Sequence, residues 1–304
     1  MMEMQGQDTI QTEQAVMTHQ QALDAAKAMG IDLLDAQLLL LHALGRSLHE
    51  RAWLLAHDAD QILQDEQNQY MALLQRRVIG VPVAYLTGVK EFYGLRFTVD
   101  KRVLVPRSDT ETLVEWASER ISCQAQKKGV FSPSVLDLGT GSGILAIMLK
   151  HLHHFSKVTA VDKSEAALSV AALNAADLLS DGQSIRFLQG RWFSPLGGEK
   201  FDLIVSNPPY IAEHDEHLNA LVHEPIEALI SGQDGLDDIR DIVQRAGQYL
   251  LPRGWLLLEH GYDQADRVRT LLKQAGFTDV QTRQDLSGTD RITGGCWKVM
   301  NIKE

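Results

Sequence analysis

Two patterns of apolar residues follow one another along the chain. From about Thr12 to Gly80, apolar residues recur every three or four positions, as on the buried face of a helix, most clearly over 33–41 and 62–78. A glycine and a proline within 80–82 end this pattern, and residues 91–99 have the composition of a short hairpin. We therefore predict a small all-α N-terminal domain over residues 1–89, followed by a hairpin linker over residues 90–106.

The rest of the chain alternates short apolar runs with helical stretches. The runs are residues 134–138, 157–161, 185–189, 202–206 and 255–259. Strands separated by helices form parallel sheets, so the alternation predicts an α/β domain over residues 90–304. The last two runs, 279–283 and 296–300, are separated by a polar loop in place of a helix. They predict a C-terminal hairpin that adds an antiparallel edge to the sheet.

The composition is that of a globular protein with one large and one small domain. Of the 304 residues, 44% are hydrophobic, which is enough for a sizeable core. No apolar run approaches the roughly 18 residues of a membrane span, and the first residues lack the pattern of a secretory signal. Cys123 and Cys296 are too few for a disulfide framework or a thiolate metal site. We therefore expect a cytoplasmic monomer with no metal and no membrane contact.

The charge pattern argues against nucleic acid as the first choice of substrate. The formal net charge is −11, and the acidic excess is spread along the chain. A protein that grips a phosphate backbone usually clusters Lys and Arg, whereas the densest basic groups here are the pairs 76–77 and 127–128. We expect no direct nucleic-acid binding, although a basic patch assembled only in the fold stays open.

A glycine-rich turn follows the first predicted strand of the α/β domain, which contains Asp137. The five residues of the turn are Gly139, Thr140, Gly141, Ser142 and Gly143. Glycines at such a turn let the backbone pass close to a ligand. A dinucleotide fingerprint would have its third glycine one position later, at Ile144, so a nicotinamide cofactor is disfavoured. Asp162 ends the next predicted strand, where a carboxylate can accept both hydroxyls of a ribose. A nucleoside without a pyrophosphate fits these parts.

These features resemble the cofactor site of Rossmann-like S-adenosylmethionine-dependent methyltransferases. The resemblance implies a seven-stranded, mostly parallel sheet with a C-terminal antiparallel hairpin. It also implies S-adenosylmethionine as cofactor and S-adenosylhomocysteine as product, with the methionine part held by the glycine turn and its amino group near Asp137. The alternative is a tight turn without a ligand, and the matching strand ends at Asp162 and Asn207 argue against it.

The third predicted strand ends differently from many proteins of this fold, which place an acidic residue there against the adenine amine. This chain has Gly190 and Arg191. The adenine contact is then expected from a backbone group or from Trp192, whose flat ring can cover the base. A partly buried core aromatic is an equally good interpretation of Trp192.

The most informative motif follows the run 202–206 and consists of Asn207, Pro208, Pro209 and Tyr210. Each proline fixes its own φ and pushes the preceding residue towards extended geometry, so the motif is a nearly rigid corner. The corner offers two acceptors, the side-chain oxygen of Asn207 and the carbonyl of Pro208, with no proline N–H beside them. Two acceptors suit an NH2 group. Tyr210 would supply an aromatic wall for a planar substrate.

The motif recurs in enzymes that methylate an NH2 group attached to a planar carbon, in adenine, cytosine or glutamine. The lone pair of such a nitrogen is delocalised, so the nitrogen attacks a methyl group poorly in water. Acceptors on both N–H groups orient it and favour its developing positive charge. Because the methylated nitrogen is acidic and loses its proton late, a strong base is not required.

Further segments resemble the protein-(glutamine) methyltransferase family known as PrmC or HemK. They are residues 85–88 (Tyr-Leu-Thr-Gly), 91–95 (Glu-Phe-Tyr-Gly-Leu), 103–111 (Val-Leu-Val-Pro-Arg-Ser-Asp-Thr-Glu), 224–225 (Glu-Pro) and 231–236 (Ser-Gly-Gln-Asp-Gly-Leu). The resemblance covers nearly the whole chain. It implies methylation of the side-chain amide of the glutamine in the Gly-Gly-Gln loop of class I peptide chain release factors, and thereby an influence on translation termination. Ser108 departs from the family pattern, which more often has a proline there.

Carried onto this chain, the family's roles make residues 207–210 the clamp for the glutamine. The same resemblance implies that Leu104, Pro106 and Arg107 line the wall of this pocket. The helical N-terminal domain adds surface without a catalytic motif, so we expect it to dock the protein substrate. A lid that only stabilises the catalytic domain is the alternative.

Three other functions stay open from the sequence. A ribosomal-protein glutamine methyltransferase shares the Val-Pro-Arg-Ser segment but usually lacks the Asp-Thr-Glu that follows here at residues 109–111. A DNA or RNA amino-methyltransferase would need a basic groove to hold a flipped base. A cofactor-binding sensor without chemistry would have the same fold but no use for paired acceptors.

Overall fold

The computed structural model of the chain describes residues 16–128 and 132–298. Contacts between residues divide it into two compact units, Met1–Thr87 and Gly88–Glu304. This division falls two residues before the boundary expected from the sequence. Each unit has its own core, and the larger one carries the glycine turn and the Asn-Pro-Pro-Tyr motif.

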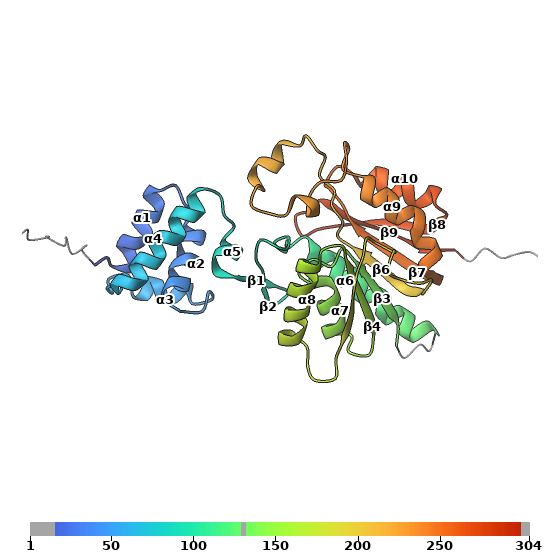
Figure 1. Ribbon diagram of the computed structural model, residues 1–304, viewed down its shortest axis with the longest axis horizontal. Coiled ribbons are helices and arrows are strands. Elements are labelled where there is room, and N and C mark those ends of the chain that lie inside the picture. Colours follow the sequence, from blue (N-terminus) through green and yellow to red (C-terminus); the bar gives the residue numbers. More distant parts are fainter. Residues whose placement is uncertain (1–15, 129–131, 299–304) are drawn as a thin grey trace, which may run out of the picture. The chain divides into compact units, whose positions relative to one another are not determined.

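The smaller unit is helical (Figure 1). Its helices are α1 (His19–Ala28), α2 (Leu33–Ala43), α3 (Arg51–Ala56), α4 (Gln64–Val78) and α5 (Val83–Thr87). Thr18 caps α1 in a capping box with Gln21, because its hydroxyl accepts from the Gln21 N–H while the Gln21 side chain accepts from the Thr18 N–H. The central α2 buries Leu39, Leu40 and Leu41 completely, which explains its nearly continuous leucine run. The short α5 after Pro82 was not expected from the sequence.

The larger unit begins with a hairpin of β1 (Val89–Phe92) and β2 (Leu95–Thr98). A seven-stranded sheet follows, as predicted. Its strands are β3 (Ser134–Leu138), β4 (Lys157–Asp162), β5 (Ile185–Gln189), β6 (Phe201–Ser206), β7 (Leu250–Glu259), β8 (Phe277–Gln284) and β9 (Asp290–Trp297), in the order β5-β4-β3-β6-β7-β9-β8. All pairs from β5 to β7 are parallel, and β9 is antiparallel to both neighbours.

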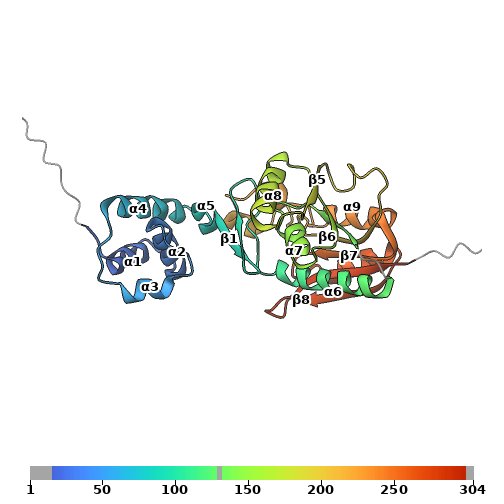
Figure 2. The ribbon, with the colours of Figure 1, turned by 90° about the horizontal axis from the view of Figure 1, so that it is seen from below.

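Helices cover both faces of this sheet. The helices α6 (Thr110–Lys128), α7 (Ile144–Leu152) and α8 (Glu165–Leu178) pack side by side on one face, and α9 (Asp237–Ala246) and α10 (Ala265–Gln274) pack together on the other. Figure 2 shows β7 between α6 and α9. All six residues of β6 are buried and four of them are apolar, as expected for a central parallel strand.

The predicted C-terminal hairpin is present, but its second strand was placed wrongly. It spans Asp290–Trp297 instead of 296–300, and residues 299–300 lie outside the described residues. The error came from Gly294 and Gly295, which hide the strand pattern. A Cβ on Gly294 would approach the Leu257 side chain to 2.4 Å and Trp116 to 3.1 Å, so close packing against β7 and α6 demands a glycine.

The sheet order fixes the place of a ligand site. From β3 the chain moves outward to β4 and β5, then returns to the other side of β3 as β6. In such sheets a crevice opens at the carboxyl ends of the strands where the order reverses, which here are β3 and β6. The glycine turn follows β3 and the Asn-Pro-Pro-Tyr motif follows β6.

Candidate active site

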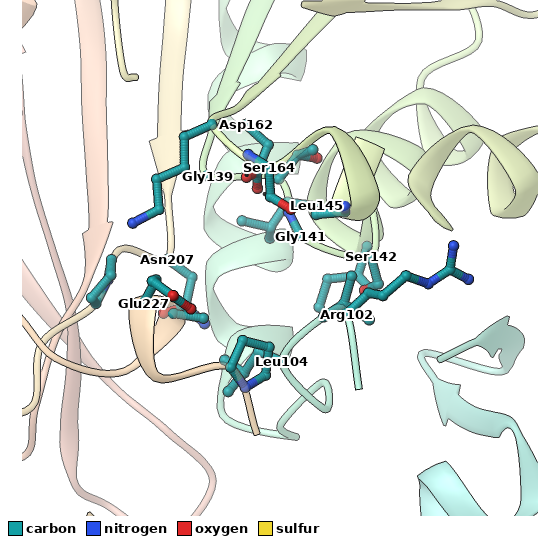
Figure 3. A pocket seen from close by; sticks show the side chains of 18 of the residues that line it. Arg102, Leu104, Gly139, Gly141, Ser142, Leu145, Asp162, Ser164, Asn207 and Glu227 are labelled. Atoms are coloured by element: carbon teal, nitrogen blue, oxygen red, sulfur yellow. Dashed lines mark hydrogen bonds between the residues drawn. The ribbon is translucent and has the colours of Figure 1, made fainter. Parts of the chain in front are cut away.

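A cavity of about 400 Å³ lies at this reversal point. That volume is within the range of small-molecule sites. Figure 3 shows Gly139 and Asp162 towards one end of it and Asn207 and Leu104 towards the other. Of the residues predicted for the site, those that line the cavity are Leu104, Pro106, Arg107, Gly139, Thr140, Gly141, Ser142, Asp162, Trp192, Asn207 and Pro209. The other four predicted residues, Asp137, Gly143, Pro208 and Tyr210, are not among the residues that line it.

The glycine turn requires its glycines for two different reasons. Gly139, Gly141 and Gly143 all have positive φ, at 73°, 54° and 85°, where other residues are strained. A Cβ on Gly143 would come within 2.9 Å of Ile147 and 3.0 Å of the Ala171 Cβ, so this glycine lets α7 pack against α8. A Cβ on Gly141 would meet nothing within 4 Å, so this glycine leaves open space beside the cavity.

Asp137 is fully buried beneath the turn. One carboxyl oxygen, Oδ2, accepts from the Thr140 hydroxyl at 2.6 Å and from the Ala146 N–H at 3.2 Å. The other, Oδ1, is buried without a hydrogen-bond partner. Burial raises the pKa of Asp137 to about 7. An unpartnered buried oxygen beneath a ligand turn fits a cationic group of the ligand, such as an ammonium.

Asp162 ties the turn to the end of β4. Its Oδ2 accepts from the Gly141 N–H and its Oδ1 from the Ser164 N–H, both at 2.9 Å. Each carboxylate oxygen can accept a second bond, so Asp162 can bind a diol while it holds the turn. Its position at the cavity wall is the one expected for a ribose contact.

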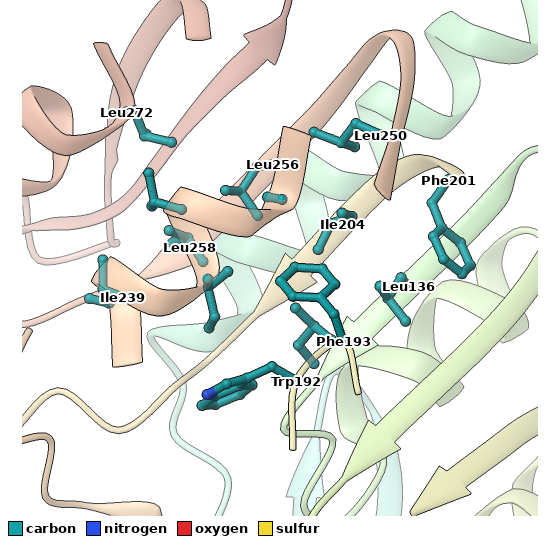
Figure 4. Close-up of a cluster of buried hydrophobic side chains, with 14 of the residues drawn as sticks. Leu136, Trp192, Phe193, Phe201, Ile204, Ile239, Leu250, Leu256, Leu258 and Leu272 are labelled. Carbon is teal, nitrogen blue, oxygen red and sulfur yellow. The ribbon is translucent and has the colours of Figure 1, made fainter. Parts of the chain in front are cut away.

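Trp192 is a buried core aromatic that also lines the cavity. Its ring belongs to the buried cluster with Leu136, Ile204 and Leu258 (Figure 4). It also lines the cavity, where it lies so close to Gly139 that a Cβ there would be 3.2 Å from the ring. The ring can therefore cover a planar group while its other atoms pack in the core.

The neighbouring Arg191 is held by helix α9. Its guanidinium forms ion pairs with Asp238 at 3.1 Å and Asp241 at 3.3 Å. Asp238 also lines the cavity and was not predicted. Asp238 lies 47 residues after Arg191 in the chain, and the fold places its acidic side chain beside that arginine.

The first and last side chains of the Asn-Pro-Pro-Tyr motif have different hydrogen-bond partners. The Asn207 side-chain nitrogen Nδ2 donates to the Thr110 hydroxyl at 3.4 Å, and Asn207 lines the cavity. The Tyr210 hydroxyl donates to the Glu259 carboxyl at 3.4 Å. Burial raises the pKa of Tyr210, with Glu259 as the second cause, so the phenol stays protonated. Neither Thr110 nor Glu259 was predicted as a site residue. Thr110 lies in the segment 103–111 that resembles the family, but only the fold brings either residue to the motif.

A second wall comes from residues 103–107 and is fastened by Glu224. This carboxylate accepts from the Val105 N–H at 2.9 Å and forms an ion pair with Arg107. Glu224 lies in the long excursion between β6 and α9, which also brings Pro225, Glu227 and Ala228 to the cavity. The pairing of residues 105–107 with 224 could not be read from spacing, because 117 positions or more separate them.

No metal centre and no membrane helix emerge from the described ranges. Among residues 16–128 and 132–298, no three His, Cys, Asp or Glu side chains gather as metal ligands would. Within the same ranges, no helix has the length and hydropathy to cross a bilayer.

Two family descriptions match the chain. Residues 14–88 match the PrmC N-terminal domain, and residues 117–234 match the Methyltransferase small domain. Among solved structures, the hMettl16 catalytic domain in complex with MAT2A 3'UTR hairpin 6 aligns with a TM-score of 0.51 and 15% identity over 72% of this chain and 81% of that chain. This likeness shows the fold alone.

Curated relatives are much more similar. A release factor glutamine methyltransferase of Burkholderia pseudomallei is 45% identical over 90% of this chain and 95% of its own length. Proteins of the same description from Vibrio cholerae and Salmonella typhimurium are 43% and 40% identical, over 87% and 86% of this chain and 90% and 91% of their own lengths. By fold, cavity and these matches, the chain belongs to the release factor glutamine methyltransferase family and is an S-adenosylmethionine-dependent methyltransferase.

Proposed function

We propose that this enzyme methylates the side-chain amide nitrogen of the glutamine in the Gly-Gly-Gln motif of class I peptide chain release factors. The proposal is carried by one observation: a rigid Asn-Pro-Pro-Tyr corner adjoins a cavity suited to a nucleoside, in a chain 45% identical to a release factor glutamine methyltransferase. S-adenosylmethionine, when bound, supplies an activated methyl group.

The residues of the cavity fit this cofactor. The open space beside Gly141 leaves room for a ligand close to the backbone. We propose that Asp137, with its unpartnered Oδ1, faces the amino group and that Asp162 accepts the ribose hydroxyls. Trp192 is proposed to cover the adenine.

The residues of the motif would act on the substrate amide. An Asn207 side chain that donates through Nδ2 to Thr110 keeps its oxygen for another partner. This oxygen and the Pro208 carbonyl would accept the two N–H groups of the glutamine and orient its nitrogen. Pro209 stiffens the corner, and Tyr210 limits the space for the planar amide. Leu104, Pro106 and Arg107 would form the opposite wall.

The charges around the cavity favour a protein substrate over a nucleic acid. Of the four cationic side chains that line the cavity, three are paired with a carboxylate of the chain, namely Arg102, Arg107 and Arg191, and the fourth is Lys163. Cations that are already paired with carboxylates attract a phosphate backbone only weakly. A DNA or RNA amino-methyltransferase is therefore the weaker proposal, and ribosomal-protein glutamine is the nearer alternative.

The proposal is tested with methyl-labelled S-adenosylmethionine and a purified class I release factor. The control substrate is the same factor with its Gly-Gly-Gln glutamine changed to alanine, and peptide mass spectrometry locates the label. We expect label on the glutamine of the unchanged factor and none on the control. Cofactor binding without label on either protein would overturn the proposal and point to ribosomal protein next.

A further inference from the structure

Gln264 is a buried glutamine whose side chain joins three segments of the larger unit. It is the N-cap residue of α10 and is only 5% exposed. Its Nε2 donates to the Tyr210 carbonyl at 2.9 Å and to the Gly235 carbonyl at 3.4 Å. Its Oε1 accepts from the Gly261 N–H at 2.8 Å. The nitrogen and the oxygen of this amide therefore both have backbone partners.

These partners allow only one orientation of the Gln264 amide. The oxygen and NH2 ends of a glutamine have almost the same shape, so hydrogen bonds distinguish them. A reversed amide would place its oxygen against two carbonyl oxygens and its NH2 group against the Gly261 N–H. The backbone N–H of Gln264 also donates to the Gly261 carbonyl at 3.0 Å. The side chain therefore extends from a turn between β7 and α10 that is itself fixed by two bonds.

The Asn-Pro-Pro-Tyr corner needs a donor from outside the motif. Pro208 and Pro209 have no N–H, so they cannot fasten the corner to a neighbouring segment as donors. The carbonyl at the end of the corner, that of Tyr210, is the one that Gln264 holds. Each proline fixes its own φ and restricts the residue before it, so the Pro208 and Tyr210 carbonyls have little freedom to move separately. A donor that holds one of them therefore orients the other.

The same side chain lies where the excursion between β6 and α9 starts and where it returns. At the start, the Ile211 N–H donates to the Leu229 carbonyl at 2.9 Å, so the outgoing and returning segments lie side by side. At the return, Gly235 has a φ of 73°, and a Cβ there would clash with the Tyr210 carbonyl oxygen. The excursion supplies part of the cavity wall. Gln264 therefore joins the corner to this wall.

We propose that Gln264 is a positioning residue that holds the Tyr210 carbonyl and thereby sets the orientation of the Asn-Pro-Pro-Tyr corner towards the transferred methyl group. Gln264 is not among the residues that line the cavity, so it acts through the corner. The inference rests on the proposed function and extends it by naming the residue outside the motif that aligns the clamp. Alignment matters because a misplacement of about 1 Å can lower a rate about a hundredfold.

Two variants of Gln264 and one matched control test this role. Gln264→Met keeps the length of the side chain and removes the amide. Gln264→Glu keeps an oxygen for the Gly261 N–H, and so the turn, but its carboxylate has no donor for the Tyr210 carbonyl. The control Gln124→Met removes the amide of another buried glutamine, whose Nε2 donates to the Arg253 carbonyl at 3.0 Å and which does not line the cavity. Circular dichroism and urea unfolding show whether each variant is folded.

We expect both Gln264 variants to lower kcat on the release factor at least about tenfold, the size of one lost hydrogen bond. KM and the cofactor Kd should stay within about twofold of the wild type. The control should keep its kcat within about twofold, even where it unfolds at the same urea concentration as Gln264→Met. Wild-type kcat in Gln264→Glu would mean that the glutamine only holds its own turn. Equal losses of kcat in Gln264→Met and Gln124→Met would mean that it only adds stability, and either result would overturn the role.

Hydrogen exchange separates this role from the proposed function. The backbone N–H groups of residues 210–213 and 229–232 should exchange at least about tenfold faster in Gln264→Met than in the wild type, and at the wild-type rate in Gln124→Met. Wild-type exchange in Gln264→Met would overturn the role even in an active enzyme. A wild-type enzyme that labels no glutamine would overturn the proposed function, and the exchange rates would still decide whether Gln264 holds the corner.

A measurement on the wild type covers the case in which the Gln264 variants do not fold. In nitrogen-15 NMR spectra, the side-chain NH2 protons of Gln264 should exchange with solvent at least about tenfold more slowly than those of the exposed Gln281. Equal exchange rates for the two glutamines would show that the bonds to the Tyr210 and Gly235 carbonyls are not kept in solution, and would overturn the role.

Discussion

The Glu224 carboxylate accepts a hydrogen bond from the Val105 N–H at 2.9 Å and so joins two walls of the cavity that lie far apart in sequence. The Glu224 side chain is only 3% exposed and also pairs with Arg107. Glu224→Ala leaves a buried N–H without a partner, at a cost of about 1–3 kcal/mol. We expect KM for the release factor to rise about 10- to 100-fold. Glu224→Gln keeps an acceptor for the Val105 N–H, so its KM should rise clearly less than that of Glu224→Ala. Equal KM values for wild type and Glu224→Ala would contradict this role.

Gly141 and Gly143 lie in the same turn and both have positive φ, but a side chain would meet open space at one and close neighbours at the other. Alanine at Gly143 adds a clash with Ile147 and Ala171 to the strain of a φ of 85°, so we expect a loss of stability of about 2–4 kcal/mol. Alanine at Gly141 meets open space and should cost about 1 kcal/mol, while its methyl group intrudes on the cofactor. Urea unfolding and cofactor titration separate the two effects. If Gly141→Ala bound S-adenosylmethionine normally, the cofactor would not approach this part of the turn.

Asp137 predicts a pH-dependent difference in stability between wild type and Asp137→Asn. Its pKa is raised by burial from 3.8 to about 7 in the folded protein. A raised pKa contributes stability that is fully present below pH 3.8 and is lost as the pH rises through about 7. Asparagine does not titrate. The free energy of unfolding of Asp137→Asn should therefore rise by about 2 kcal/mol relative to that of the wild type between pH 5 and pH 7.

The measurement for Asp137 is urea unfolding of both proteins at a series of pH values without cofactor. Other titrating groups, such as His260, are common to the two proteins and cancel in the difference. Asparagine also keeps an oxygen for Thr140 and Ala146, which makes it a matched replacement. A difference that stays constant from pH 5 to 8 would show that Asp137 is ionised throughout.

The sequence predicted the sheet and the cofactor turn because both depend on local patterns. The strand before Gly139 and the strand before Asn207 are apolar runs that end in recognisable motifs. The second strand of the C-terminal hairpin was misplaced because Gly294 is selected by packing against Leu257, a contact that no periodicity reveals. The local pattern therefore predicted the elements in which buried positions recur regularly. It failed where a single close contact determines which residue can occupy a position.

The supporting residues of the site could not be predicted for a related reason. Thr110, Glu224 and Glu259 act on partners 97, 119 and 49 positions away in the chain. Thr110 and Glu224 lie in segments that resemble the family and Glu259 does not, but in each case only the fold shows which residue it contacts. Asp238 belongs to the same class, since it meets Arg191 through helix α9.

Asp238 leads to a prediction about cofactor recognition. It lies in the cavity wall beside Arg191, the residue that stands where many proteins of this fold have an acidic residue against adenine. We expect Asp238→Ala to raise the Kd for S-adenosylmethionine about five- to tenfold, the size of one hydrogen bond, and to have no effect on an analogue without the 6-amino group. Asp241→Ala is the control, because Asp241 pairs with Arg191 at 3.3 Å from the same helix. An equal loss of cofactor affinity in Asp238→Ala and Asp241→Ala would mean that the two carboxylates only hold Arg191 in place.

The helical unit gives the last prediction, because it has a buried core of its own and the cavity residues all come from the larger unit. A Gly-Gly-Gln loop is too small to form a specific interface of roughly 1,200–2,000 Å², so we propose that the helical unit docks the rest of the release factor. Removing residues 1–87 should raise KM for the intact factor at least about tenfold. A short peptide with the Gly-Gly-Gln motif should be a poor substrate that both proteins methylate equally. Circular dichroism and the cofactor Kd must first show that the shortened enzyme is folded. A folded enzyme with unchanged activity on the intact factor would rule out docking and leave the helical unit a stabilising role.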